Sequence, residues 1–186
     1  MHVTLRALFR PLRSQHVFPT LGLALSAATR RTKRFRILHF SVQSDHLHLI
    51  VEASDKKALS SGMQSVAILV ARSVNRLVMR RGRFWADRWH GRALTSPRQV
   101  RNALVYVLAN FRKHATARLP AGIDAFSSAL RFDGWRVATS GELPRAGPPY
   151  HATMARWVEV SEPETWLGAT GWKRAGLLSV DEAPRA

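Results

Sequence analysis

Alternating apolar and polar positions predict two adjacent β-strands in the first third of the chain. In residues 35–42, Leu38, Phe40 and Val42 share one side. Residues 42–52 alternate in the same way, so that successive side chains point to opposite faces. One face carries Leu47, Leu49 and Val51, and the other carries His46, His48, Ile50 and Glu52. The turn-like Gln43-Ser44-Asp45 between the two stretches indicates a hairpin.

Apolar residues at helical spacing predict three helices. We expect them from about Gln15 to Arg31, from Lys57 to Arg81 with Gly82 as the stop, and from the Ser96-Pro97 cap to about His114. A short strand at His2–Leu5 and a fourth strand that runs through Leu94 complete the set. The apolar stripes of the helices are Phe18, Leu21, Leu25 and Ala28; Leu59, Met63, Val66, Val70, Val74 and Leu77; and Val100, Leu104, Val107, Leu108 and Phe111.

The order of these elements is β-α-β-β-α-β, followed by one more helix. It predicts an α+β fold of the ferredoxin-like type, as in RRM domains. Such a fold has a four-stranded antiparallel sheet with two helices on one face and the other face open. We expect His46 and His48 to lie on that open face.

Residues 119–186 differ in character from residues 1–118. Proline and glycine divide them into short pieces, and the hydrophobic anchors are Trp135, Trp157, Trp166 and Trp172. We therefore expect a domain over residues 1–118 and a partly ordered C-terminal appendage over residues 119–186. The pattern leaves open whether the appendage lies over the first domain or is a flexible tail.

Positive charge is concentrated in the first domain. The chain has 29 Lys and Arg against 12 Asp and Glu, a net charge of +17, yet residues 1–119 contain only four acidic residues, Asp45, Glu52, Asp55 and Asp87. This balance is typical of polyanion binding, with nucleic acid as the default partner. The arginines are spread over several elements, which disfavours an anionic membrane as the partner. No apolar run is long enough for a membrane span, and the lack of cysteine fits a cytoplasmic protein.

Two histidines and one tyrosine are the candidates for chemistry. His46 and His48 can hold one divalent metal ion through neutral ring nitrogens, although a histidine pair beside a core strand need not bind anything. Tyr106 lies one helical turn before Asn110. A metal ion can polarise a phosphate while a phenol attacks phosphorus, and the Asn110 amide oxygen suits Mg²⁺ or Mn²⁺. Alternatively, Tyr106 is an interfacial tyrosine whose ring lies in the core.

Several cationic and aromatic residues are candidates for DNA contacts. In the second helix three arginines recur every four residues, a spacing that costs helix stability unless an anion neutralises it. The two tryptophans before the last strand either stack on unpaired bases or anchor a loop in the core. We assign to DNA binding Arg72, Arg76, Arg80, Trp85, Arg88, Trp89, Arg92 and Lys113.

Four separated motifs resemble the IS200-like family of single-tyrosine (HUH) transposases. They are His46-Leu47-His48, Trp85-Ala86-Asp87-Arg88-Trp89, Tyr106-Val107-Leu108-Ala109-Asn110 and the opening His2-Val3-Thr4-Leu5-Arg6, which is similar to the REP-associated branch. The resemblance implies metal-dependent cleavage and rejoining of single-stranded DNA at hairpin-flanked sites. It implies His46 and His48 as metal ligands, Tyr106 as the nucleophile that forms a 5′-phosphotyrosine link, and Asn110 as a further ligand. Two positions depart from the family pattern: Asp45 replaces the usual Asn, and Phe111 the usual Pro.

The sequence therefore predicts a cytoplasmic, nucleoid-associated transposase that cuts and rejoins single-stranded hairpin DNA with Mg²⁺ or Mn²⁺. The alternative is a non-catalytic protein that binds structured DNA on the same fold. An RNA-binding domain is disfavoured, because the sheet face carries histidines and a carboxylate instead of exposed aromatic residues. The intact set of His46, His48 and Tyr106 favours the enzyme over a pure binder. Assembly as a homodimer is left open.

Overall fold

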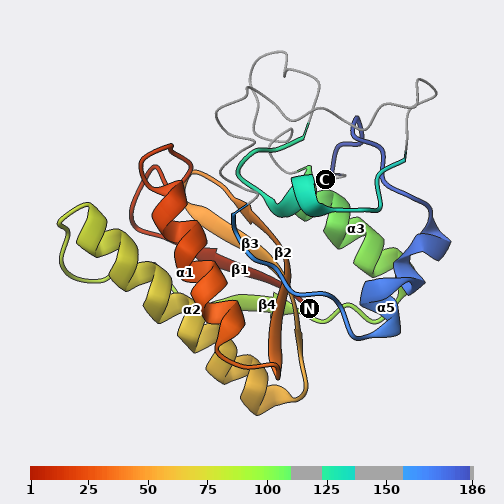
Figure 1. The fold of residues 1–186 in the computed structure, drawn as a ribbon, viewed down its shortest axis with the longest axis horizontal. Coiled ribbons are helices and arrows are strands. Elements are labelled where there is room, and N and C mark those ends of the chain that lie inside the picture. The colour runs from red at the N-terminus through yellow and green to blue at the C-terminus, as the bar shows by residue number, and fades with distance from the viewer. Residues whose placement is uncertain (110–122, 137–156, 185–186) are drawn as a thin grey trace.

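Residues 1–109, 123–136 and 157–184 are described by a computed structural model of the chain (Figure 1). The sheet consists of β1 (His2–Arg6), β2 (Phe35–Val42), β3 (His46–Ala53) and β4 (His90–Arg92). The strands lie in the order β2-β3-β1-β4, and all neighbouring pairs are antiparallel. This order confirms the predicted ferredoxin-like α+β fold.

Two helices, α1 (Phe18–Arg30) and α2 (Lys56–Leu77), cover one face of the sheet (Figure 1). All four residues of the stripe predicted for the first helix are buried, as are the middle four of the stripe predicted for the second. They pack with Leu47, Leu49 and Val51 of β3 in one hydrophobic core. The side-chain alternation predicted for this strand is therefore confirmed.

The opposite face of the sheet is covered, which corrects the prediction of an open face. The helix α3 (Pro97–Leu108) packs against β2 and β3 on that side. A second hydrophobic core joins Leu38 and Ile50 of the sheet to the apolar side of α3 and to Trp172, which is 2% exposed. Because these strands offer apolar residues on both faces, an amphipathic helix can be buried on each side.

The described C-terminal residues share the two hydrophobic cores with the sheet and its helices, which is the packed alternative of the two. They form η2 (Ser128–Arg131), α5 (Trp166–Ala169) and η3 (Gly171–Ala175). The Glu52 carboxylate at the end of β3 accepts hydrogen bonds from the backbone N–H groups of Glu164 and Thr165 (2.8 and 3.3 Å). Arg101 of α3 holds the Glu182 carboxylate with two hydrogen bonds of 2.7 Å.

Among the described residues, no helix combines the length and the hydrophobicity that a membrane crossing requires.

A bulge in β2 changes the predicted side of Leu38. The pairing of β2 with β3 shifts between Ile37 and His39. Leu38 consequently belongs to the second core, whereas Phe40 and Val42 belong to the first. One extra residue in a strand reverses the alternation that precedes it, so the simple period-two prediction was wrong at this position.

The helix α2 ends earlier than the predicted Arg81. Its last helical residue is Leu77, and Met79 leaves the helix with a φ of 50°. Arg80 therefore lies beyond the helix, where its guanidinium donates to the Asn75 side-chain oxygen over 3.2 Å. Of the predicted arginine stripe, only the first two members are on the helix, and both are exposed.

Candidate active site

Tyr106 of α3 lies against the histidine pair of β3. Its ring meets that of His48 edge-on, with 5.1 Å between the ring centroids. The rings of His46 and His48 are 4.6 Å apart. Tyr106 is half-buried, and His48 is only 3% exposed. The packing of α3 on the sheet thus brings together a phenol and two imidazoles that are remote in the sequence.

A third imidazole, that of His2 on β1, belongs to the same cluster. Its ring centroid is 5.3 Å from that of His48 and 5.4 Å from that of Tyr106. Burial, followed by the N-terminal ammonium group and Arg92, lowers the pKa of His2 to about 4, so the imidazole is neutral at pH 7. The sequence-based predictions gave His2 no role in the site. The available signal was its alternation with Thr4, which puts both side chains on one face of the first strand.

Each β3 histidine uses its Nδ1 atom in contacts within the protein. The Nδ1 of His46 lies 2.7 Å from an Asp45 carboxylate oxygen. The Nδ1 of His48 lies 3.1 Å from the Thr4 hydroxyl and 3.3 Å from the Nε2 of His2. Metal-binding histidines commonly engage one ring nitrogen in this way and coordinate through the other. The Nε2 atoms are therefore the nitrogens suited to a metal.

Asp45 is held in its ionised form at this position. The hydrogen bond from His46 is the largest influence that lowers the Asp45 pKa, and the positive charges of Arg10 and Arg6 act in the same direction. Arg10 also forms a direct ion pair with the carboxylate. The ionised carboxylate therefore places a negative charge beside the first histidine of the pair.

Two imidazoles are a partial ligand set for a divalent metal. Within residues 1–109, 123–136 and 157–184, no three His, Asp or Glu side chains are grouped to hold a metal ion by themselves. Mg²⁺ prefers oxygen ligands and usually keeps several waters, so two imidazoles would supply only part of its coordination shell. Asn110 and Lys113 lie outside the described residues, since α3 ends at Leu108 and the described segment at 109.

The family comparison covers the part of the chain that holds this cluster. Residues 20–107 match the family model described as "Transposase IS200 like". The match spans just under half of the 186 residues and includes His46, His48 and Tyr106, whereas His2 lies outside it. The mixed α/β structure with its antiparallel sheet is consistent with that family, and the match supports a DNA-processing enzyme of transposition. No curated protein and no solved structure matches the chain.

A cavity of about 740 Å³ lies beside Tyr106. Its polar lining includes His2, Arg92, Arg98 and Asn102. Arg92 pairs with His2 across the β1–β4 ladder, which fixes its place next to the cluster. Glu182 also lines the cavity, but Arg101 binds its carboxylate. The cavity thus combines a candidate nucleophile with guanidinium groups, which are suited to binding phosphate.

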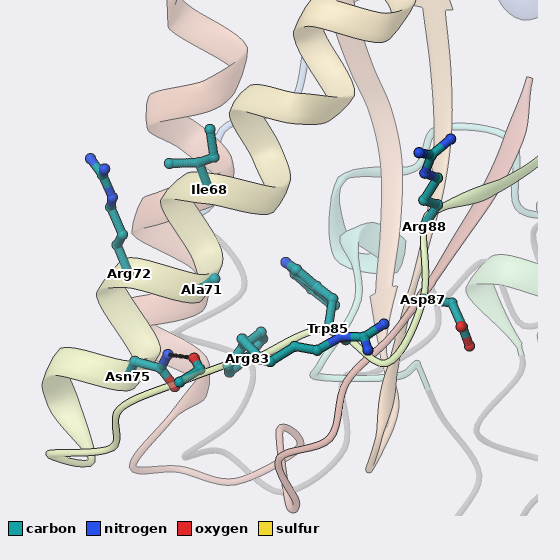
Figure 2. Close-up of a pocket in the computed structure, with 10 residues that line it drawn as sticks. Ile68, Ala71, Arg72, Asn75, Arg83, Trp85, Asp87 and Arg88 are labelled. Carbon is teal, nitrogen blue, oxygen red and sulfur yellow. Dashed lines mark hydrogen bonds between the residues drawn. The ribbon is translucent and has the colours of Figure 1, made fainter.

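A second cavity, of about 510 Å³, lies between α2 and the segment that leads to β4 (Figure 2). Three residues assigned to DNA binding line it: Arg72, Trp85 and Arg88. Figure 2 shows Arg72 on α2 and Arg88 on the facing segment, with Trp85 between these two elements. Of the five assigned arginines, Arg72 and Arg88 line this cavity and Arg92 lines the Tyr106 cavity, whereas Arg76 and Arg80 line neither of the two.

The two assigned tryptophans serve the fold. The indole N–H of Trp85 donates to the Ala67 carbonyl of α2 over 2.9 Å, and its ring packs edge-on against Phe84. Trp89 is half-buried and packs against the first core. Of the two alternatives for these residues, the structure supports the anchoring of a loop. Trp85 also lines the second cavity, where part of its ring is suited to contact with a ligand.

Proposed function

We propose that this chain is a metal-dependent endonuclease and strand transferase for single-stranded DNA, of the REP-associated branch of the IS200-like family. Its substrates are hairpin-flanked sites, and the reaction proceeds through a 5′-phosphotyrosine intermediate. The observation that carries the proposal is the 5.1 Å contact between the rings of Tyr106 and His48. The match of residues 20–107 to the IS200-like transposases supports it independently.

In the proposed reaction, the Tyr106 oxygen attacks the scissile phosphorus while the bond to the 3′ oxygen breaks. The phenol loses one proton and the departing 3′ hydroxyl gains one, so the step is balanced. The product is a DNA 5′ end joined to the tyrosine, which keeps the bond energy for rejoining. The reverse attack by a 3′ hydroxyl restores a phosphodiester and the free phenol.

The other residues of the cluster hold and orient the reacting groups. His46 and His48 would bind Mg²⁺ or Mn²⁺ through Nε2, and Asn110 is the proposed further ligand. When bound, such a metal neutralises charge on the phosphate and helps the 3′ oxygen to leave. Asp45 and Thr4 hold the imidazoles through Nδ1. Arg92 and Arg98 in the adjoining cavity bind the phosphodiester backbone.

The decisive experiment tests for a covalent adduct. Single-stranded hairpin oligonucleotides are incubated with the protein and Mg²⁺ or Mn²⁺. We expect a protein–DNA adduct on a denaturing gel. Tyr106→Phe should abolish the adduct and leave DNA binding nearly intact, because only the attacking oxygen is removed. Tyr150, the other tyrosine of the chain, provides the matched control, since Tyr150→Phe should keep the adduct.

One result would favour the non-catalytic alternative. If the wild-type protein binds these hairpins tightly but forms no adduct with either metal, the chain is a structured-DNA-binding protein on the same fold. An adduct that survives in Tyr106→Phe and is lost in Tyr150→Phe would mean that Tyr150, and not Tyr106, is the nucleophile.

A further inference from the structure

Some arginines of this protein pair with carboxylates, and others do not. Those near α1 and β2 are neutralised by carboxylates, as in the ion pairs Arg13–Asp124, Arg30–Glu159, Arg34–Asp55 and Arg36–Glu164. In the described parts of the chain, no carboxylate forms an ion pair with Arg72, Arg88, Arg92 or Arg98. Among the described residues, these four arginines therefore have no carboxylate that pairs with them.

These four arginines follow the β4 edge of the sheet. β4 is the outer strand in the order β2-β3-β1-β4, and its three residues are exposed. Arg72 and Arg88 line the cavity on the α2 side of this edge (Figure 2). Arg92 and Arg98 line the cavity on the α3 side, together with Tyr106. We call the four arginines and the strand between them the β4-edge surface.

We propose that the β4-edge surface binds one continuous single strand of DNA, which runs from the Tyr106 cavity around β4 to the cavity beside α2. The inference deepens the proposed function, because it assumes that the strand is cut at Tyr106. It assigns Arg72 and Arg88 to a part of the strand several nucleotides from the scissile phosphate.

The charge of the β4-edge surface and the lining of the α2 cavity favour single-stranded DNA as the ligand. A DNA backbone presents a negative charge at every nucleotide, which matches a row of guanidinium groups that no carboxylate of the described residues neutralises. The α2 cavity also has an apolar lining that includes Ile68, Ala71 and Trp85. Unpaired bases have exposed faces that can lie on such a lining, whereas the bases of a duplex are stacked within the helix. A single strand therefore fits both features.

The test uses oligonucleotides of increasing length and the non-cleaving Tyr106→Phe protein. Fluorescence anisotropy would measure the affinity for a hairpin that ends near the cleavage site and for hairpins extended by about ten single-stranded nucleotides on the 5′ or 3′ side. In the Tyr106→Phe background, the added double substitution Arg72→Ala/Arg88→Ala should weaken binding of one extended hairpin at least tenfold. It should change the affinity for the short hairpin less than twofold.

Matched variants distinguish a specific role of Arg72 and Arg88 from a general loss of positive charge. Arg30→Ala/Arg34→Ala removes the same charge from ion-paired positions and should leave the length dependence unchanged. Arg72→Lys/Arg88→Lys should restore most of the lost affinity. In the Arg72→Ala/Arg88→Ala variant, the slope of log affinity against log salt should become shallower by about 1.4. This value is about 0.7 for each of the two phosphates that an arginine no longer neutralises.

Two outcomes would overturn the inference: an equal loss for short and extended hairpins, or an equal loss in the Arg30/Arg34 variant. Neither outcome bears on cleavage, which the adduct assay measures with the wild-type protein. Conversely, a wild type that shows the length dependence and forms no adduct would leave the surface intact and refute the nuclease.

Discussion

At the scale of single residues, Asp45 determines which nitrogen of His46 can bind a metal. An ionised carboxylate only accepts hydrogen bonds, so the Nδ1 atom of His46, 2.7 Å away, must carry the proton. In the neutral imidazole the lone pair then resides on Nε2. The carboxylate also makes the ring a stronger ligand.

We expect Asp45→Ala to weaken Mn²⁺ binding about 10- to 100-fold, because the carboxylate then no longer keeps the proton on Nδ1 of His46 or holds the orientation of its ring. Asp45→Asn should have a smaller effect, since the amide oxygen can still accept the hydrogen bond. Electron paramagnetic resonance of free Mn²⁺ in titrations of the protein would measure both. Asp133→Ala, at an exposed carboxylate that pairs with Lys173, is the control. Unchanged affinity in Asp45→Ala would refute this role.

His39 provides a prediction about pH. Its Nδ1 lies 3.2 Å from the Ser128 hydroxyl, and its ring packs edge-on against Phe132. Burial lowers the pKa of His39 to about 4, although Asp133 acts in the opposite direction. Between pH 6.5 and 4 the unfolded chain therefore binds a proton that the folded protein excludes.

The free energy of unfolding should consequently fall as the pH decreases from 6.5 to 4, by up to about 3 kcal/mol from this group. Urea unfolding at pH 7, 5.5 and 4.5 would measure the fall. His39→Gln should reduce the dependence without removing it, because His2 has a similarly lowered pKa. A His39→Gln protein with the full wild-type dependence would contradict the assignment to His39.

At the scale of elements, the contact between α2 and β2 depends on a glycine. A methyl group at Gly62 would lie 2.1 Å from the Phe35 ring. Both residues are buried in the first core, so neither side can yield without repacking. The close approach of helix and strand thus requires the missing side chain.

Overpacking by Gly62→Ala should cost about 1–3 kcal/mol. The gain in helix propensity, about 1 kcal/mol, offsets part of this cost, so the free energy of unfolding should fall by up to about 2 kcal/mol. Thermal melting followed by circular dichroism would measure the change. The neighbouring Ser61 is exposed, so Ser61→Ala should leave the melting temperature unchanged or slightly raised. A more stable Gly62→Ala protein would show that Phe35 moves aside freely.

At the scale of the whole molecule, the C-terminal segment completes the second core. Trp172 is 2% exposed and packs on Phe132, with 5.4 Å between the ring centroids. This core holds α3 on the sheet, and α3 carries Tyr106. The position of the candidate nucleophile therefore depends on residues outside the matched family region.

We expect Trp172→Ala to lower the free energy of unfolding by about 3–5 kcal/mol, as for other buried large-to-small substitutions. Trp157 is 76% exposed, so Trp157→Ala should change the free energy of unfolding by less than about 0.5 kcal/mol. Urea unfolding monitored by tryptophan fluorescence and by circular dichroism would measure both. A Trp172→Ala protein of wild-type stability would mean that the C-terminal segment contributes little to the fold.

The sequence alone determined the elements and their order. Strand alternation assigned Leu47, Leu49 and Val51 to one face and the two histidines to the other, because this period depends only on neighbouring residues. Helical spacing identified the buried stripes for the same reason. The motifs around His46, His48 and Tyr106 were sufficient to select these three residues as candidates.

Only the tertiary structure decided how the two faces of the sheet are used. The bulge beside Leu38 depends on the pairing of β2 with β3, and the burial of the second face depends on α3 and on Trp172. His2 joins the cluster because β1 lies between β3 and β4. Such contacts link residues far apart in the chain, and their formation depends on packing that no local pattern encodes.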